Sequence, residues 1–175
     1  MIGSATQSTF AIAHQPEYEH TQWAPMCWIM LLPALAILFV VGMLSGDGNV
    51  VLPLFIAGTL VTAIAFSFRS LRVVDEGDVL AVRFGPLPLF RKRIPYDQVI
   101  AAERDQSAVI DGWGIHWVPG RGWTYNLWGF DCVRLTLTRG RTLRIGTDDP
   151  DGLARFLAKK CAAQQQGAET DRPNS

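Results

Sequence analysis

The chain has 175 residues, of which 49% are hydrophobic and 18% charged, a length that allows one small domain besides a membrane hairpin. Its sixteen basic and sixteen acidic side chains cancel, and the part from Arg69 onward holds sixteen basic against thirteen acidic groups, a surplus of only three. This balance argues against a nucleic-acid-binding protein. The three cysteines, Cys27, Cys132 and Cys161, have no metal-ligand spacing and provide no disulfide framework.

Two uncharged apolar segments, 26–44 and 50–68, are separated by a short polar turn over residues 45–49. Each has 19 residues, which at about 1.5 Å per residue covers roughly the 30 Å hydrocarbon thickness of a bilayer. The alternative is a hairpin buried in a soluble core, but apolar runs of core helices are typically about 10 to 14 residues long. The pattern therefore predicts a transmembrane helical hairpin, with the lipid bilayer as its first partner.

The basic residues predict the orientation of this hairpin. All of them lie at or after Arg69, and Arg69 and Arg72 follow the second segment directly, as is typical of a cytoplasmic flank. We therefore expect a multi-pass protein of the inner (cytoplasmic) membrane with both termini in the cytoplasm and a first helix that is retained. Trp23 and Trp28 bracket the start of that helix, where indole rings serve as interfacial anchors.

Residues 1–25 mix polar and small side chains without periodicity, which predicts a mobile tail with no folded unit. His14 and His20 flank two glutamates there, but their spacing matches no familiar metal site. At the other end, residues 164–175 are polar and of low complexity, and we expect them to be disordered.

Residues 69–163 alternate apolar and polar positions and predict a mainly β domain. Strands are expected at 79–84, 87–94, 96–103 and 114–118, and a hairpin at 132–138 and 141–147 with a tight turn at Arg139-Gly140. Residues 147–152 combine a capping residue, acids and a proline, which predicts the start of a helix. Its apolar stripe consists of Leu153, Phe156, Leu157 and Cys161.

Within residues 72–160, the stretches 93–100 (RIPYDQVI) and 143–150 (LRIGTDDP) resemble membrane-anchored bacterial proteins with a pleckstrin-homology-like (PH-like) domain. The resemblance implies a PH-like roll, a bent antiparallel sheet of about seven strands closed at one end by the carboxyl-terminal helix. It also implies a role in binding rather than catalysis, and it supplies no defined site residues. The fold class expected is therefore an α-helical transmembrane hairpin followed by this roll.

Residues 111–130 are rich in aromatic side chains and glycine, and include Trp113, Trp117 and Trp123. One interpretation is that these rings fill the core of a small sheet while the glycines occupy turn positions. The other is a groove for a ligand or peptide, or an indole-rich loop that dips into the headgroup region.

Arg91, Lys92 and Arg93 are three adjacent cations in a domain tethered close to the bilayer. On a strand, alternation places Arg91 and Arg93 on one face and Lys92 on the other. They are candidates for binding lipid or a partner, because a basic residue near an anionic leaflet contributes about 1 kcal/mol. The alternative is a solvated edge strand that discourages pairing with other chains.

No grouping of nucleophile, base and acid, no phosphate-binding glycine loop and no paired carboxylates stand out in the sequence. We therefore expect no enzymatic activity, no cofactor and no catalytic or metal-binding residue. The function expected is a cytoplasmic binding or scaffolding module for a protein partner, which could be another membrane protein. The alternative function is recognition of anionic lipid headgroups, and the sequence does not indicate the oligomeric state.

Overall fold

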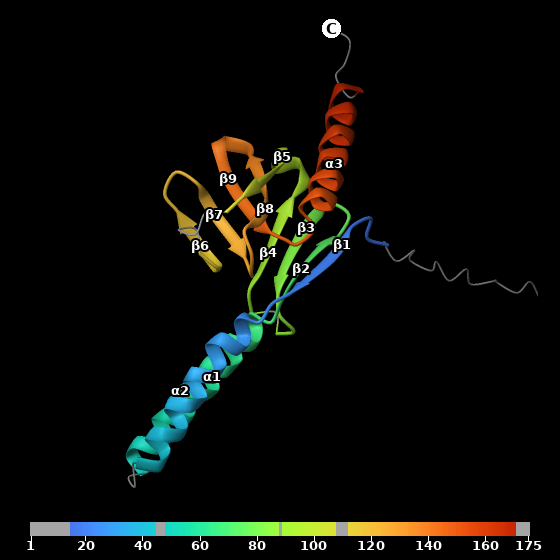
Figure 1. Cartoon of the computed structure of the whole chain (residues 1–175). Helices are drawn as coiled ribbons and strands as arrows, with labels where there is room; N and C mark the ends of the chain where they lie inside the picture. Colours follow the sequence, from blue (N-terminus) through green and yellow to red (C-terminus); the bar gives the residue numbers. More distant parts are fainter. Residues whose placement is uncertain (1–14, 45–47, 88, 108–111, 171–175) are drawn as a thin grey trace, which may run out of the picture.

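The computed structural model describes residues 15–44, 48–87, 89–107 and 112–170, and Figure 1 shows a long helical hairpin that leads into a β domain. The hairpin consists of α1 (Met26–Leu44) and α2 (Gly48–Ser67), which pack against each other. Both predicted apolar helices are thus confirmed, the first with the expected bounds. The second begins two residues earlier and ends one residue earlier than expected.

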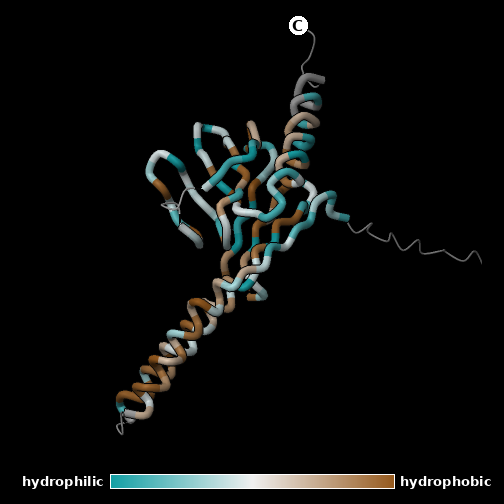
Figure 2. The backbone as a smooth tube through the Cα atoms, viewed as in Figure 1, coloured by the Kyte–Doolittle hydropathy of each residue, from teal (hydrophilic) through white to brown (hydrophobic). Residues whose placement is uncertain are grey.

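The side chains of this hairpin point outward rather than into a protein core. Both helices are long and apolar enough to cross a membrane, and only 11% and 17% of the residues in their apolar windows are buried. Apolar residues follow the hairpin along most of its length (Figure 2). A core helix of a soluble protein would bury most of this surface, so the structure does not support the buried-hairpin alternative.

The β domain has two sheets. The first has the order β1-β2-β3-β4, with β1 (Glu19–Trp23), β2 (Ser70–Asp75), β3 (Val79–Phe84) and β4 (Arg91–Pro95), and all its pairs are antiparallel. A single 3-10 turn, η1 (Tyr96–Gln98), leads to the second sheet, of order β5-β8-β9-β7-β6. The strands of that sheet are β5 (Val99–Gln106), β6 (Gly114–Val118), β7 (Gly122–Asn126), β8 (Asp131–Leu137) and β9 (Arg141–Gly146).

This arrangement departs from the single antiparallel sheet of about seven strands implied by the resemblance. Nine described strands form two sheets, and β7 pairs with β9 in parallel. β8 lies between β5 and β9, so β7 pairs with the other side of β9. The pair is parallel because the short connection 127–130 reverses the chain from β7 into β8, and the β8–β9 hairpin reverses it again. The coarser expectation, a helical hairpin followed by a mainly β region and a carboxyl-terminal helix, is confirmed.

The expected hairpin near the carboxyl end is present. β8 and β9 are antiparallel and joined by η3 (Thr138–Gly140), in which Arg139 and Gly140 have φ angles of 63° and 67°. The apolar positions of both strands, among them Leu135 and Ile145, are buried in the core as alternation predicted. Strands at 79–84 and 114–118 also match β3 and β6, whereas the candidate at 96–103 begins as η1 and becomes β5 only at Val99.

The closing helix, α3 (Pro150–Thr170), packs mainly on β5. Its predicted apolar stripe, Leu153, Phe156, Leu157 and Cys161, lies in the core with side chains of both sheets. The expectation of disorder from residue 164 is wrong as far as Thr170, because the helix continues to that residue. Alanine, glutamine and glutamate, which make up most of this stretch, are good helix formers despite its low complexity.

The expectation of no folded unit before the hairpin is wrong for residues 19–23, which form β1, while residues 1–14 lie outside the described part. β1 pairs antiparallel with β2, so the helical hairpin is an insertion between two neighbouring strands. The ladder extends to the helix ends, where the N–H of Ala24 donates to the carbonyl of Arg69 at 3.3 Å. The described residues before α1 and those after α2 therefore lie at the same end of the hairpin.

Candidate functional site: a basic groove beside the helices

The outer face of the first sheet carries a row of arginines. Arg72 of β2 lies opposite Arg83 of β3, and Arg83 lies opposite Arg91 of β4. The neighbouring positions on β2, Leu71 and Val73, are buried in the core. Because side chains alternate along a strand, the arginines between them must face away from the core.

Next to this row, the surface forms an open groove of about 600 Å³ at the end of the sheet where the helices begin and end. Arg69, two residues after the end of α2, contributes to it, as do Arg72 and Arg83. Its remaining lining residues are Glu19, Thr21, Trp23, Ser70, Gly85 and Pro86. The groove thus joins three cations, one indole and one carboxylate at the junction between helices and sheet.

Two carboxylates partly balance these cations. Arg72 forms an ion pair of 2.8 Å with Glu19, and Arg83 forms one with Glu76. Arg93 also reaches Glu76, at 3.1 Å. Since all these side chains are partly solvent-exposed, each pair contributes little to stability, typically below about 1 kcal/mol. Their arginines can therefore exchange a carboxylate for another anion at low cost.

Arg69 is held by aromatic rings. Its guanidinium carbon lies 5.5 Å from the ring centroid of Trp23 and 5.6 Å from that of Phe66. These cation–π contacts orient the guanidinium at the level of the helix ends. Trp23 and Trp28 are 64% and 53% exposed, so both indoles remain free to meet lipid. Their role as interfacial anchors stays a prediction.

The predicted basic cluster divides as alternation required. Arg91 and Arg93 lie opposite Arg83 and Ala81 on the outer face, while Lys92 lies opposite the buried Val82. Arg91 therefore extends the arginine row, and Lys92 does not. Arg83 was not recognised from the sequence, although its place between the apolar Val82 and Phe84 in an alternating strand was a signal for an outward cation.

The aromatic stretch is mostly not core. Trp113, Trp117 and Trp123 are 43%, 57% and 49% exposed, so the interpretation that they fill the core is wrong for these three rings. Trp128 and Tyr125 do pack against the core. Trp117 and Trp123 lie on β6 and β7, the two strands at one edge of the second sheet, towards the end of the hairpin that is away from Gly114.

The three exposed tryptophans of this stretch and the partly buried Trp128 form two pairs. Trp113 stacks on Trp128 with 4.3 Å between ring centroids, beside Gly114, whose Cβ position would lie 3.9 Å from the ring of Phe68. Trp117 lies directly opposite Trp123 in the β6–β7 ladder. The second pair is three residues further along the hairpin, about 10 Å from Gly114. The structure thus places one indole pair near the helix ends and one further out.

Strand β1, which forms one wall of the groove, is held by a buried carboxylate. Asp75 accepts hydrogen bonds from the Tyr96 hydroxyl at 2.9 Å and from the backbone N–H groups of Glu17 and Gly77 at 3.2 and 3.0 Å. Lys160 Nζ lies 3.4 Å from the same carboxylate. Burial raises the pKa of Asp75, but the hydrogen bonds and the Lys160 charge outweigh it and hold that pKa below its usual value.

Further contacts connect the segment containing β1 to α3 and the turn before it. The Tyr18 ring stacks on Phe156 at 5.2 Å, and its hydroxyl donates to Asp149 at 3.2 Å. His20 is hydrogen-bonded to Asp148. Burial and the Asp149 charge raise the pKa of Tyr18. The amino-terminal strand is therefore an integral part of the β domain.

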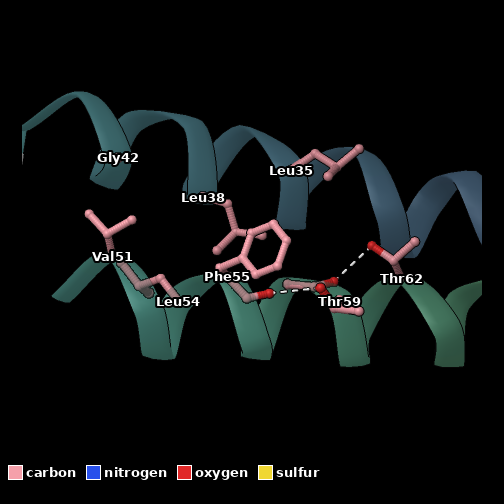
Figure 3. Close-up of a pocket in the computed structure, with 9 residues that line it drawn as sticks. Leu35, Leu38, Gly42, Val51, Leu54, Phe55, Thr59 and Thr62 are labelled. Carbon is pink, nitrogen blue, oxygen red and sulfur yellow. Dashed lines mark hydrogen bonds between the residues drawn. The ribbon is translucent and has the colours of Figure 1, made fainter. Parts of the chain in front are cut away.

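A second, apolar groove of about 380 Å³ runs between α1 and α2 (Figure 3). Leu38 packs against Gly58, where an added Cβ would overlap the leucine side chain. Thr59 and Thr62 donate their hydroxyls to carbonyls of their own helix, at 2.9 and 2.7 Å. The groove therefore offers no free polar group, and its chemistry matches the hydrocarbon region of a bilayer.

Among the described residues, no group of three or more His, Cys, Asp or Glu side chains is placed to hold a metal ion. No protein-family model matches the chain, and no curated protein matches it. The function is therefore inferred from the chemistry of the grooves and exposed side chains.

Proposed function

We propose that α1 and α2 span the cytoplasmic membrane and that the β domain, of the PH-like type, is a non-catalytic binding module on its inner surface. Its ligand is the headgroup phosphate of an anionic lipid in the leaflet next to the domain. The observation that carries this proposal is the convergence of Arg69, Arg72 and Arg83 on one groove at the helix ends. Arginine is suited to phosphate, because its planar fork of N–H donors matches two phosphate oxygens.

The position of the groove supports a lipid rather than a soluble anion. The Arg69 and Trp23 side chains lie within the turn of chain that joins the helices to the sheet, where headgroups would surround a membrane-spanning hairpin. The exposed Trp23 adds an indole of the kind enriched at membrane interfaces. A cytoplasmic location follows from the same arginines, since basic flanks remain on that side.

The lipid proposal predicts that Arg72→Gln combined with Arg83→Gln weakens retention of anionic lipid. At about 1 kcal/mol for each basic residue, the loss is at most roughly 30-fold in affinity. The measurement is native mass spectrometry of the full-length protein released from membranes of phosphatidylcholine and phosphatidylglycerol. Retained phosphatidylglycerol should decrease in the double variant and with added salt.

The matched control replaces Arg139 and Arg141 by glutamine, since both are exposed and lie at the η3 turn. This control should retain lipid as the original chain does. Addition of inorganic phosphate distinguishes a lipid site from a free-anion site, because only the latter should be emptied at modest phosphate concentration. Equal retention of both lipids by the original chain would contradict the proposal.

A second candidate function is docking of a protein partner on the Trp117–Trp123 pair. These two tryptophans occupy directly opposite positions on adjacent strands and remain about half exposed, and aromatic residues of this kind are enriched at binding hot spots. β6 is also the terminal strand of its sheet, so an extended segment of a partner could pair with it.

The partner candidate predicts that a photocrosslinking residue at Trp117 captures a defined protein in intact membranes. Adding Trp123→Ser should abolish that capture, because it removes half of the proposed contact. A crosslinker placed at Arg155 is the control and should not capture the same protein, because this exposed residue lies on α3, which packs on β5 at the opposite edge of the sheet from β6. Capture only of lipid from Trp117 would contradict this second function.

A further inference from the structure

Two exposed leucines lie in the loop between β3 and β4. Leu87 and Leu89 are 41% and 57% exposed, although the flanking Phe84 is buried and Phe90 packs against the core. Isolated exposed apolar residues are common on proteins, but these two are near neighbours on a loop beside the helices. Their position relative to the helix ends decides what they meet.

The loop is fixed against the end of α2. The backbone of Gly85 lies so close to Ser67, the last residue of α2, that an added Cβ would overlap the Ser67 carbonyl. Gly85 N–H also donates to the carbonyl of Ser70 at 2.7 Å. The start of the loop therefore lies at the level where α2 leaves the apolar hairpin.

The far end of the loop is held at the same level. Phe84 N–H donates to the Phe90 carbonyl at 2.9 Å, which closes the loop. The Phe68 ring, directly after α2, contacts the rings of Phe84 and Phe90 at centroid distances of 5.4 and 5.5 Å. Figure 1 shows this loop beside the upper end of the helical hairpin, at the base of the β domain. Leu87 and Leu89 are thus presented next to the helices by a braced loop.

We propose that Leu87 and Leu89 insert into the interfacial region of the membrane and form a third attachment besides α1 and α2. The inference rests on the proposed function, because it requires that the two helices span the bilayer. The occupant of this apolar surface is lipid, since the loop is continuous with the lipid-facing hairpin through Ser67 and Phe68. Arg91 follows the loop directly and is placed to meet headgroups above the inserted leucines.

A third attachment has a functional consequence. Two short connections, 24–25 and 68–69, already join the sheet to the helices, and both lie at the ends of the paired strands β1 and β2. With only these two connections, on neighbouring strands, the β domain could still rotate relative to the helices about the line that joins the connections. Insertion of the β3–β4 loop removes this rotation and holds the basic groove, which includes Gly85 and Pro86, against the headgroups.

The experiment measures the depth of the loop in full-length protein reconstituted in vesicles of phosphatidylcholine and phosphatidylglycerol. An environment-sensitive fluorophore is attached at Leu89→Cys, and quenching by lipids spin-labelled at the headgroup or along the chain is compared. The three native cysteines are buried, at 3%, 0% and 8% exposure, so labelling is selective for the introduced thiol. We expect quenching at Leu89→Cys to be strongest with a label at the headgroup or upper chain.

Two reference positions make the result specific. Ile37→Cys lies eleven residues into α1, about 17 Å along the helix and near the bilayer centre, and should be quenched best by deep labels. Arg139→Cys, on the η3 turn, should not be quenched. Adding Leu87→Asp to the Leu89→Cys chain should cause loss of quenching, because a carboxylate opposes insertion of the loop.

The outcomes separate the two proposals. Deep quenching at Ile37→Cys with none at Leu89→Cys would overturn the third attachment and leave the membrane-spanning assignment standing. Absence of quenching at Ile37→Cys would overturn both. Quenching at Leu89→Cys that persists after Leu87→Asp would show that the fluorophore alone inserts, and would also overturn the attachment.

Discussion

Replacement of Asp75 by alanine is expected to destabilise the β domain by roughly 3 kcal/mol, a large share of the total stability of a small domain. The carboxylate is buried and joins the amino-terminal segment, Tyr96 and Lys160. Its removal leaves the Tyr96 hydroxyl and the N–H groups of Glu17 and Gly77 without this acceptor. Thermal unfolding of the full-length protein in detergent, followed by tryptophan fluorescence, measures the loss.

The lowered pKa of Asp75 predicts how the stability of the folded domain depends on pH. The folded-state pKa of Asp75 lies below the ordinary value of 3.8, so the folded form binds the proton less readily than the unfolded chain. Its contribution is therefore fully present above about pH 4 and is lost as the pH falls through the folded-state pKa. Asp75→Asn should remove this part of the acid dependence and lower stability at neutral pH.

A matched control is Asp148→Ala. Asp148 also joins the amino-terminal segment to the α3 end of the domain, through His20, but its side chain is 56% exposed. Loss of such a surface pair should cost less than about 1 kcal/mol. If Asp75→Ala were no more harmful than Asp148→Ala, the buried carboxylate would not be the group that holds β1 in place.

Replacement of Gly85 by alanine is expected to disrupt the junction between α2 and the sheet. Gly85 has a φ angle of +59°, and its added Cβ would overlap the Ser67 backbone. The left-handed conformation costs an alanine about 1–2 kcal/mol, and overpacking against a rigid backbone typically costs a further 1–3 kcal/mol. Thermal unfolding of full-length protein should show a loss of roughly 3 kcal/mol.

Gly140 provides the comparison, because its φ angle of +67° is similar but an added Cβ meets nothing within 4 Å. Gly140→Ala should therefore show only the backbone cost, about 1–2 kcal/mol. The difference between the two variants reports the close approach of the β3–β4 loop to α2. Equal losses would mean that the loop is not braced against the helix, and would weaken the argument that Leu87 and Leu89 are held at the membrane.

Much of the candidate site could be anticipated from local pattern. The shared face of Arg91 and Arg93 followed from strand alternation, and the closeness of Arg69 and Arg72 to the helix end followed from sequence distance. Arg83 was missed because nothing in the sequence says that β2, β3 and β4 are neighbours in register. The groove exists only through that register, which places Arg72 opposite Arg83.

The core assignment of the tryptophans failed for a related reason. Hydrophobicity predicts that indole rings tend to be buried, but burial depends on what covers a strand. β6 is the terminal strand of its sheet. Among the described residues, too few cover Trp117 and Trp123 to bury them, and both remain about half exposed. Trp128 has the same chemistry but packs against the core. It lies in the short connection between β7 and β8, next to the fully buried Leu127.

By itself, the amino-acid sequence determined the two apolar helices, the β8–β9 hairpin and the apolar stripe of α3, because each depends on the periodicity of neighbouring residues. Only the tertiary structure decided that β1 pairs with β2 across the inserted hairpin, that β7 runs parallel to β9, and that three arginines share one groove. Those features depend on contacts between residues far apart in the chain. Such contacts are selected by the packing of the whole domain, for which local periodicity carries no signal.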